Sequence, residues 1–581
     1  MVKTILKRVR EYKKASILSP LFVSLEVILE CLIPFVMAKV IDENTGNLNP
    51  IIKYGSILIV MAFTSLLCGV LAGKFCSKAA AGLAKNLRHD LYHQVQDFSF
   101  ENIDNFSSSS LVTRMTTDVN NVQFAYMMVI RTAVRAPFML IFALFMAFQI
   151  SAKLAWIFVA VIPFLGFALF FIIFKVMPLF QKVFKKYDKI NDSIQENISG
   201  SRVVKSYVRE DYEIKKFEDA ASDVAKDFTR AEKILAFNGP IMQFAIYISN
   251  ILIAILGARL IINTNQVELK VGELTSLLAY EMQILSSLMV VSMIFVMVTM
   301  AIPCMKRIAE VLNEKSTIVN PENPIYEVEN GNISFENVSF KYSKNAEKNA
   351  LNNINLNIKS GQTIGIIGGT GSAKTTLIQL ISRLYDTSEG VVKVGDKDVK
   401  DYDLVTLRDS VSVVLQKNVL FSGSIKENLR WGDKNATDEE LIEACKLAQA
   451  HEFIESFPDK YDTHIEQGGT NVSGGQKQRL CIARALLKKP KIIILDDSTS
   501  AVDTKTDALI RNSFKKYIPE TTKIIIAQRI SSIMDADLIL VMDSGEIVDQ
   551  GNHDELLARN SIYQEVYYTQ NKIGGNEDGK E

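Results

Sequence analysis

Six long apolar runs fill the first 305 residues of this 581-residue chain and then stop. Most of them are long enough to cross about 30 Å of hydrocarbon as helices. The pattern therefore predicts a membrane unit of six helices, with both ends of the unit on the same side of the bilayer. The runs lie near Ala15–Val40, Ser56–Phe75, Ala133–Ile150, Leu154–Phe174, Phe237–Ile262 and Leu274–Cys304.

Basic residues indicate which side that is. Residues 1–14 hold Lys3, Lys7, Arg8, Arg10, Lys13 and Lys14 against the single acid Glu11. The segments after the second and fourth runs are also long and basic, whereas the other connections are short. By the positive-inside rule, we expect the N-terminus and everything after the sixth run to be cytoplasmic. No internal-organelle signal is present, so we expect a bacterial plasma membrane.

The two long inner segments, residues 76–131 and 176–235, are polar, show helical periodicity and contain few helix breakers. They are predicted to be helices that run well beyond the membrane and turn at short tips, near Asn102–Ser110 and near Asp211. Ordinary loops are the alternative.

After Pro303 the composition changes, and a segment with Pro321 and Pro324 is typical of a linker. Short apolar runs then alternate with helical patterns, which predicts an α/β domain with a mostly parallel sheet. The domain bounds that we predict are 1–312 for the transmembrane domain, 313–330 for the linker, 331–572 for the α/β domain and 573–581 for a disordered tail. The expected strands are Thr363–Ile367, Val411–Leu415, Ile492–Leu495, Lys523–Ala527 and Leu538–Met542.

Charge and cysteine usage exclude several classes of protein. Lys plus Arg equals Asp plus Glu, 65 each, so the basic excess expected of a nucleic-acid partner is missing. Only six Cys occur and none forms a C-x-x-C pair, which excludes a disulfide scaffold or a zinc ribbon.

A glycine-rich loop joins the strand Thr363–Ile367 to an apolar helix. It fits the phosphate-binding pattern G-x-x-x-x-G-K-[ST], except that Ala373 replaces the last Gly; we expect Ala373 to take a helical conformation that accepts Ala. Backbone N–H groups would surround the phosphates of ATP, Lys374 would neutralise them, and the Thr375 hydroxyl would reach Mg²⁺. The predicted loop comprises Gly368, Gly369, Thr370, Gly371, Ser372, Ala373, Lys374, Thr375 and Thr376.

A second buried strand ends in two carboxylates, Asp496 and Asp497. The first would hold Mg²⁺ through water, and the second stands where a water-activating base belongs. A turn formed by Ser473, Gly474, Gly475 and Gln476 opens another helix and is a second anion site. If the two helix starts lie far apart, they cannot serve one triphosphate, whereas a head-to-tail dimer would close each turn over the other subunit's nucleotide.

With these motifs, nearly the whole chain resembles a half-size ATP-binding cassette (ABC) exporter of the six-helix type with long intracellular loops. The resemblance implies that Tyr342 stacks on adenine, that Gln416 is the Q-loop glutamine and a Mg²⁺ contact, and that Asp503 belongs to the D-loop. The tips near Asn102–Phe106 and Tyr207–Asp211 would dock on nucleotide domains. The matching segments are Gly368–Thr376 (Walker A), Val472–Gln476 (signature), Ile492–Asp497 (Walker B), Ser500–Asp503 (D-loop), Glu196–Lys205 (second intracellular loop) and, more weakly, Ser110–Asp118 (first intracellular loop).

The chain departs from the family in its own catalytic residues. Asp497 stands in place of the catalytic Glu, which retracts the carboxylate by roughly 1.5 Å and can cost about 100-fold in rate. Gln528 replaces the switch His and cannot carry a proton at neutral pH. Gln467 replaces a usual Glu, whereas the signature is intact.

This combination resembles the degenerate subunit of a heterodimeric exporter. The site with Asp497, Gln528 and Gln416 would bind ATP and hydrolyse it weakly, and a partner half-transporter would supply an intact catalytic Glu and switch His. A homodimer in which Asp497 is slow but adequate is the alternative.

Polar residues inside the apolar runs are candidates for a substrate path. Glu26 and Glu30 are spaced i, i+4 on the first run, and Arg131 and Arg135 have the same spacing at the third. Charges in lipid are costly, so they either attract cationic amphiphiles or pair with each other to fix helix packing. A methionine stripe on the sixth run is either ordinary packing or an adaptable apolar surface. The remaining candidates on that run are Glu281, Gln283, Met289, Met293, Met297 and Met300.

The function implied is ATP-driven export of amphiphilic small molecules, drugs or lipids, by an ABC-type ATPase. The alternative is an ATP-binding regulatory or sensing subunit that gates a partner without itself pumping. Both require ATP, Mg²⁺, a lipid membrane and a second half-transporter.

Overall fold

The structure is a computed structural model that describes residues 1–43, 48–343, 346–497 and 502–574. Residues 575–581 of the predicted tail and Ser500 and Ala501 of the predicted D-loop therefore lie outside the described residues. The chain divides into two compact units. The first comprises Met1–Gln96 and Ser107–Glu314, and the second comprises Asp97–Phe106 and Lys315–Glu581.

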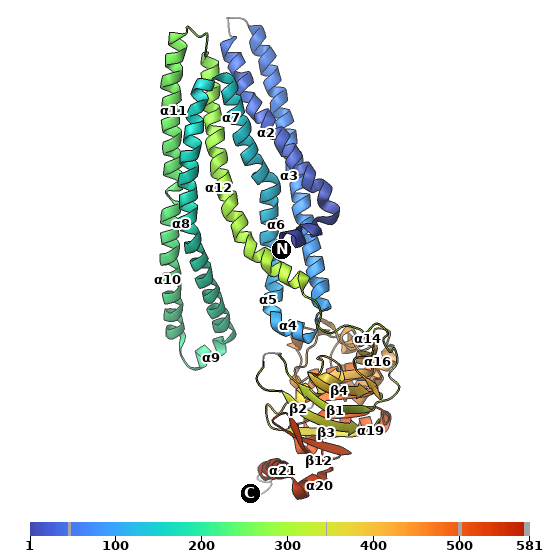
Figure 1. Cartoon of the computed structure of the whole chain (residues 1–581). Helices are drawn as coiled ribbons and strands as arrows, with labels where there is room; N and C mark the ends of the chain where they lie inside the picture. Colours follow the sequence, from blue (N-terminus) through green and yellow to red (C-terminus); the bar gives the residue numbers. More distant parts are fainter. Residues whose placement is uncertain (44–47, 344–345, 498–501, 575–581) are drawn as a thin grey trace. The chain divides into compact units, whose positions relative to one another are not determined.

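The first unit is helical (Figure 1). Among the described residues, six of its helical segments are long and apolar enough to cross a membrane, which confirms the prediction of six spans. The elements are α1 (Val2–Leu6), η1 (Lys7–Tyr12), α2 (Lys13–Asp42), α3 (Leu48–Gln96), α5 (Ser108–Thr113), η2 (Arg114–Asp118), α6 (Val119–Met127), η3 (Met128–Thr132), α7 (Ala133–Ile150), α8 (Ala152–Ser199), α9 (Ser201–Ser206), α10 (Glu210–Leu235), α11 (Asn238–Asn263) and α12 (Val271–Asn313).

The helices of the two long inner segments, α3 and α8, are far longer than a bilayer requires. α3 has 49 residues and α8 has 48, which corresponds to about 70 Å of helix at 1.5 Å per residue. The interpretation of the long inner segments as helices is therefore correct, and the alternative of ordinary loops is wrong. α10 packs along α8, and the short α9 joins them at the predicted second tip (Figure 1).

Inside the first unit, polar side chains cross-link apolar helices at their backbones. The Tyr280 hydroxyl donates to the carbonyl oxygen of Cys31 at 2.6 Å, and the Ser276 hydroxyl donates to that of Pro34 at 2.6 Å. Pro34 has no N–H, so the Glu30 carbonyl loses its helical partner, and Gln283 Nε2 donates to it at 3.4 Å. Such bonds are usual between membrane helices, because the alternative is an unsatisfied polar group in hydrocarbon.

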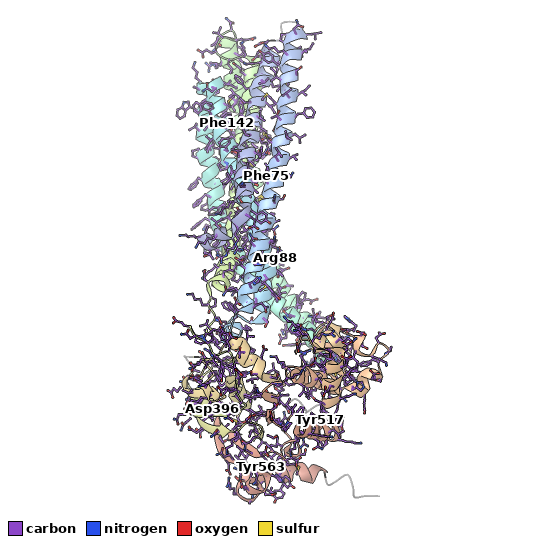
Figure 2. All side chains as sticks on the ribbon, turned by 90° about the vertical axis from the view of Figure 1, so that its right-hand side faces the viewer. Phe75, Arg88, Phe142, Asp396, Tyr517 and Tyr563 are labelled. Carbon is purple, nitrogen blue, oxygen red and sulfur yellow. The ribbon has the colours of Figure 1, made fainter. Side chains whose placement is uncertain are left out.

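Aromatic side chains pack between and along these helices, and Figure 2 labels two of them, Phe75 and Phe142. Phe75 of α3 stacks on Phe22 of α2 with ring centroids 5.7 Å apart, and Phe142 of α7 stacks on Phe138 at 6.1 Å. Many other aromatic and aliphatic side chains on these helices are exposed, as expected of a surface that faces lipid.

The second unit is an α/β domain. The principal sheet has the order β12-β11-β3-β10-β9-β6, in which β12 is antiparallel to β11 and the other pairings are parallel. A separate antiparallel sheet has the order β2-β1-β4-β5, and β7 pairs with β8. The strands are β1 (Ile333–Phe340), β2 (Leu351–Ile358), β3 (Thr363–Gly368), β4 (Glu389–Val394), β5 (Lys397–Asp398), β6 (Val411–Val414), β7 (Gly423–Ser424), β8 (His464–Ile465), β9 (Ile492–Asp496), β10 (Thr522–Ile526), β11 (Leu538–Asp543) and β12 (Glu546–Gly551).

The predicted parallel strands are all present, whereas the antiparallel sheet was not predicted from the sequence. The helices and turns of this unit are α4 (Phe100–Phe106), α13 (Lys374–Ile381), α14 (Leu404–Ser410), α15 (Ile425–Leu429), α16 (Asp438–Leu447), α17 (His451–Glu455), η4 (Lys460–Asp462), η5 (Gln467–Gly469), α18 (Gly474–Leu487), α19 (Thr504–Tyr517), η6 (Ile530–Ser532), α20 (His553–Arg559) and α21 (Ser561–Gly574).

The register of the parallel strands determines where a site can form. Ile526 of β10 lies beside Ile366 of β3 on one side and Asp496 of β9 on the other. β6 runs parallel to β9 and ends beside it, with Val414 opposite Leu495. The residues that follow these four strands therefore meet at one edge of the sheet, where α/β proteins bind ligands.

Candidate functional site

The predicted phosphate loop follows β3 and opens α13. Lys374 Nζ donates to the carbonyl oxygens of Gly368 at 2.9 Å and Gly369 at 2.7 Å, and to Ser372 Oγ at 3.1 Å. Burial lowers the pKa of the Lys374 ammonium. The ammonium is thus held by the loop itself, at the N-terminus of a helix where anions bind favourably.

Ala373 departs from our expectation. It has φ +68° and ψ +25°, which is the left-handed region and not the helical conformation that we predicted. The loop has to reverse direction at this point to bring Lys374 into α13, and the family's glycine does so without a Cβ penalty. An alanine in this conformation costs about 1–2 kcal/mol.

Thr375 and Asp496 form a pair of oxygen donors at the start of α13 and the end of β9. Thr375 Oγ1 donates to Asp496 Oδ2 at 2.9 Å. Asp496 is buried, and this burial raises its pKa despite the hydrogen bond from Thr375. A hydroxyl beside a buried carboxylate is a hard-oxygen donor set, so these residues fit Mg²⁺.

Asp497, the predicted base, is held by two glutamines. Gln528 Nε2 donates to its Oδ2 at 2.7 Å, and Gln416 Nε2 donates to the same oxygen at 3.4 Å. The backbone of Asp497 has φ +49°, and its N–H donates to Ile526 O at 3.0 Å. The structure therefore brings the three predicted catalytic residues together, but it directs both amides at the carboxylate.

Gln478 completes this arrangement and was not predicted from the sequence. Its Nε2 donates to the Asp497 carbonyl oxygen at 3.4 Å from the buried face of α18. The only sequence signal for Gln478 was its position two residues after the signature turn Ser473–Gln476.

Tyr342, the predicted adenine platform, lies beside the phosphate loop. Its hydroxyl is 2.8 Å from Thr376 Oγ1, and its ring meets those of Phe340 and Tyr385 edge-on, at 4.9 and 5.3 Å between centroids. Burial raises the pKa of the Tyr342 hydroxyl. These contacts fix the Tyr342 ring at the edge of the site, and the residue is 46% exposed.

The signature turn opens α18 with a reciprocal cap. Ser473 Oγ accepts from the Gln476 N–H at 3.3 Å, while the Ser473 N–H donates to Gln476 Oε1 at 2.9 Å. The N–H groups of Gly474 and Gly475 lie in the first turn of this helix. Asp503 caps α19 by accepting from the Thr506 N–H at 2.9 Å, and this bond lowers the pKa of Asp503.

The two predicted anion sites of the chain are separate. Among the residues that the structure describes, no hydrogen bond joins Ser473–Gln476 to the phosphate loop Gly368–Thr376. The head-to-tail dimer stays a prediction from the sequence.

α4, the first predicted tip, packs on the α/β domain within the second unit. Tyr385 donates from its hydroxyl to Asp104 Oδ2 at 2.6 Å, and its ring lies 6.1 Å from that of Phe100. Asn102 Nδ2 donates to Lys315 O at 3.2 Å. The prediction that Asn102–Phe106 docks on this domain is confirmed; Tyr385 itself was missed, because a lone tyrosine between motifs gives no sequence signal.

The predicted substrate residues separate into two groups. Arg135 pairs with Glu26 at 2.5 Å and with Glu30 at 2.8 Å, which links α7 to α2. The structure thus supports the pairing interpretation for these three residues. It does not bring Glu281 into the cluster: both carboxylate oxygens of Glu281 are buried without a hydrogen-bond partner among the described residues.

The other substrate candidates contribute no pairing to this cluster. Arg131 lies on η3, a π-helical turn, with its guanidinium facing Gly73 of α3. On α12, the side chains of Met289 and Met293 are 40% and 56% exposed. These two methionines are therefore surface and not core packing in this chain.

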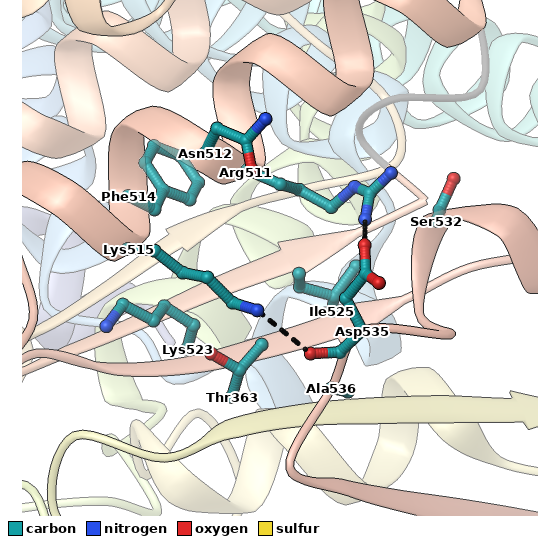
Figure 3. A pocket seen from close by; sticks show the side chains of 10 residues that line it. All are labelled: Thr363, Arg511, Asn512, Phe514, Lys515, Lys523, Ile525, Ser532, Asp535 and Ala536. Carbon is teal, nitrogen blue, oxygen red and sulfur yellow. Dashed lines mark hydrogen bonds and ion pairs between the residues drawn. The ribbon is translucent and has the colours of Figure 1, made fainter. Parts of the chain in front are cut away.

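A small cavity of about 20 Å³ lies elsewhere in the domain, between α19, β10 and η6 (Figure 3). Arg511 donates to Asp535 Oδ2 at 2.8 Å and Lys515 donates to the Asp535 carbonyl oxygen at 3.3 Å. A volume of this size holds about one water, so the cavity has no room for a nucleotide or a drug.

Comparison with known proteins places these features in a family. Residues 16–311 match a family model described as the ABC transporter transmembrane region, and residues 351–500 match one described as ABC transporter. The chain is 34% identical to an uncharacterized ABC transporter ATP-binding protein, YfiB, of Bacillus subtilis over 94% of each chain. It is 32% identical to an uncharacterized ABC transporter ATP-binding protein of Mycobacterium tuberculosis over 98% of each.

A solved structure has the same fold. It is described as a bacterial Atm1-family ABC exporter with ATP bound, and it superimposes with a TM-score of 0.81 at 23% identity, covering 97% of this chain and 99% of that one. The six apolar helices, the phosphate loop and the family matches lead to one conclusion: this chain belongs to the ABC transporter family and carries a transmembrane region and an ABC-type ATPase on one polypeptide.

Proposed function

We propose that this chain is the degenerate-site subunit of a heterodimeric ABC exporter that moves amphiphilic small molecules across the plasma membrane. The observation that carries the proposal is the arrangement around Asp497. A base has to accept a proton from the attacking water, and it needs a free oxygen at the γ-phosphate to do so. Asp497 is one methylene shorter than the family's Glu, and its Oδ2 accepts from Gln528 and Gln416.

Gln528 contributes to the same effect. A histidine at this position could contact the γ-phosphate and change its protonation near neutral pH, whereas a glutamine amide has no such proton. Its Nε2 donates to Asp497 Oδ2 at 2.7 Å, so the amide occupies a carboxylate oxygen that a catalytic base would offer to the attacking water.

Nucleotide binding does not depend on these residues. Lys374 and the N–H groups at the start of α13 would hold the phosphates of ATP, and Tyr342 would support the adenine. Thr375, Asp496 and Gln416 would hold Mg²⁺, which neutralises phosphate charge when it is bound. A site of this kind retains ATP and hydrolyses it slowly.

A partner half-transporter would complete the proposed exporter. The intact turn Ser473–Gln476 offers an anion site that this chain's own phosphate loop does not use. At the second tip, apolar side chains are exposed, Tyr207 to 73% and Val208 to 81%, which suits docking on a partner's nucleotide domain. Closure of the two nucleotide domains would then rotate the membrane helices as rigid bodies.

The substrate class rests on the membrane unit. Met289 and Met293 present soft apolar surface on α12, which suits varied apolar ligands. The Glu26–Arg135–Glu30 cluster supplies polar groups on the neighbouring α2 and α7. The positive-inside rule orients the unit with its N-terminus and its nucleotide domain in the cytoplasm.

ATP turnover by the purified chain tests the degenerate site. The wild-type chain alone should bind ATP and hydrolyse it slowly, and the double variant Asp497→Glu, Gln528→His should hydrolyse it at least tenfold faster. The matched variant Lys374→Ala, made in the double variant, should abolish the gain. Brisk hydrolysis by the wild-type chain alone would support the homodimer instead.

The partner and the substrate require two further observations. A neighbouring reading frame that encodes a half-transporter with the catalytic Glu and switch His would identify the partner. Uphill, ATP-dependent transport of a cationic dye by the pair in vesicles separates an exporter from a regulatory subunit that only gates its partner. If Glu26→Gln and Glu30→Gln leave this transport unchanged, these carboxylates bind no cationic substrate.

A further inference from the structure

Glu281 lies in the apolar helix α12, ten residues after its start at Val271, and is 0% exposed. Neither carboxylate oxygen has a hydrogen-bond partner among the described residues. An ionised carboxylate in such a place costs many kcal/mol, and a buried carboxyl group avoids this cost by holding a proton. The cluster of Glu26, Glu30 and Arg135 shows the alternative, in which the charges pair, and Glu281 is not part of it.

The register of α11 and α12 shows what faces Glu281. The two helices are antiparallel, and a Cβ at Gly257 of α11 would collide with the side chain of Leu274 of α12. Counting back from Gly257 and forward from Leu274 places Ser249 and Asn250 opposite Glu281. One further turn along, Ile246 packs in the same cluster as Leu285, which agrees with this register.

Ser249 repeats the unusual feature of Glu281. It is also 0% exposed, and its hydroxyl has no hydrogen-bond partner among the described residues. Two fully buried polar side chains without partners thus lie on facing positions of two membrane helices. The Ser249 hydroxyl can donate to either form of Glu281, but only the protonated carboxyl group is uncharged, so a proton removes the cost of a buried charge that one serine hydrogen bond would leave.

The other titratable groups near Glu281 either have a hydrogen-bond or ion-pair partner or lie off the buried face of α11. On α12, the Tyr280 hydroxyl donates to Cys31 O, and on α2 Glu30 pairs with Arg135 of α7. The buried residues of α8 around this point are Leu165 and Leu169. The buried stripe of α11 contains Ala245, Ile246, Ser249, Ile253 and Gly257 and has no titratable side chain.

The connectivity suggests when Glu281 meets water. α12 continues into the linker of this chain's own nucleotide domain, whereas α11 continues through α10 to the tip at α9. If α9 follows a partner's nucleotide domain, as the proposed function has it, then α11 and α12 follow different nucleotide domains. Their contact is then one that the transport cycle opens and closes.

We propose that Glu281 is a proton-binding site of the membrane unit, occupied when α11 and α12 are packed and exchanged with water when they separate. On opening, the Glu281 O–H bond breaks, the proton passes to water and the carboxylate is hydrated. On closing, a proton from water returns to the carboxylate. Each cycle of the exporter therefore takes up and releases one proton at this position.

Infrared spectroscopy of the full chain in lipid tests the occupied state directly. At neutral pH the wild type should show the carbonyl stretch of a protonated carboxyl group shielded from water, and Glu281→Gln should lose it. The matched control Glu268→Gln removes an exposed carboxyl, paired with Lys153, and should keep the band. Retained ATP binding shows that each variant is folded. A band absent from the wild type, or unchanged in Glu281→Gln, would overturn the proposal.

A cysteine reporter tests the exchange. Ile253→Cys places a thiol on the buried stripe of α11, one turn from Ser249, where a water-soluble maleimide reacts only when the helices separate. One proton released on opening shifts the equilibrium up to tenfold per pH unit, so labelling should rise with pH by up to that factor over the Ile253→Cys, Glu281→Gln variant. Equal labelling of both variants at every pH would overturn the exchange step.

These tests are separate from the test of export. A wild type that shows the infrared band but does not transport in vesicles contradicts the proposed function and leaves the proton site intact. A transporter without the band contradicts the proton site alone.

Discussion

In the proposed degenerate site, two glutamines and one shortened acid would limit the hydrolysis of ATP. Gln528 and Gln416 both donate to Oδ2 of Asp497. The residue types could be predicted from the motifs, because Walker-type patterns have fixed spacing. The mutual hydrogen bonds could not, because they depend on the left-handed backbone of Asp497 and on the register of β10 beside β9.

Asp496 should limit the stability of the nucleotide-free chain. Its burial raises its pKa in the folded state, so the ionised form destabilises the fold at neutral pH and this cost disappears as the pH falls below that pKa. Asp496→Asn should therefore raise the melting temperature at pH 7, with a smaller difference at acidic pH. It should also lose the Mg²⁺-dependent part of the stabilisation by ATP, which reaches about 2.7 kcal/mol for the wild type at 100 times Kd. A lower melting temperature for the variant at pH 7 would contradict the assignment.

Ala373 should carry measurable backbone strain. Ala373→Gly removes the Cβ at φ +68° and should stabilise the chain by about 1 kcal/mol, after allowance for the greater freedom of glycine in the unfolded state. Thermal unfolding in detergent measures this. The control Ala558→Gly, on the exposed face of the right-handed helix α20, should destabilise by about 0.5–1 kcal/mol. Destabilisation by both substitutions would rule out the strain.

At the scale of elements, the sequence predicted most of what carries function. The six spans, the helical extensions and the parallel strands follow from hydrophobic periodicity, which is local. The antiparallel sheet β2-β1-β4-β5 was missed, since its strands have interrupted patterns such as Leu351–Ile358, where Asn alternates with apolar residues. The docking of α4 needed a long-range partner, Tyr385, that no local pattern identifies.

The Tyr385 hydroxyl should couple α4 to the nucleotide domain. Tyr385→Phe keeps the ring between Phe100 and Phe340 but loses the 2.6 Å bond to Asp104, a hydrogen bond to a charged group worth about 1.5–3 kcal/mol. Substrate-stimulated ATPase of the complex should fall, while ATP affinity stays unchanged. Asp104→Asn added to Tyr385→Phe should cause little further loss; additive losses would show that the two residues act independently.

Removing Arg135 alone from its ion pairs with Glu26 and Glu30 should lower the stability of the membrane unit more than removing all three charges. Arg135→Gln leaves Glu26, which is buried, and Glu30 without their cation and should destabilise the chain by about 3 kcal/mol. The triple variant with Glu26→Gln and Glu30→Gln removes every charge and should recover most of this loss. Melting temperatures in detergent provide the measurement, and a triple variant as unstable as Arg135→Gln would mean that packing, not charge, is responsible.

At the scale of the whole molecule, one chain is expected to contribute unequally to two nucleotide sites. In the proposed heterodimer, its phosphate loop would belong to its own site and its signature turn would belong to the partner's. This asymmetry was predicted from three substitutions against the family pattern. The identity of the partner and of the substrate is not encoded in any local pattern of this chain.

Two substitutions in this chain should separate the sites. In the complex with the partner, Ser473→Ala should remove most steady-state ATPase activity, because Ser473 serves the catalytic site, in addition to a capping loss of about 1 kcal/mol in α18. Lys374→Ala should retain a substantial part of the activity, because it affects the weakly hydrolytic site. Equal loss from both substitutions would indicate two equivalent sites.

Tyr385 touches two parts of the domain at once: its ring meets that of Tyr342 at 5.3 Å, and its hydroxyl holds Asp104 of α4. If a base rests on Tyr342, then two contacting side chains, Tyr342 and Tyr385, connect the nucleobase to α4. Inorganic tripolyphosphate would fill the phosphate loop yet leave this relay untouched. ATP and tripolyphosphate would then differ in two ways: in how tightly each binds, and in whether a movement of Tyr342 reaches α4 through Tyr385.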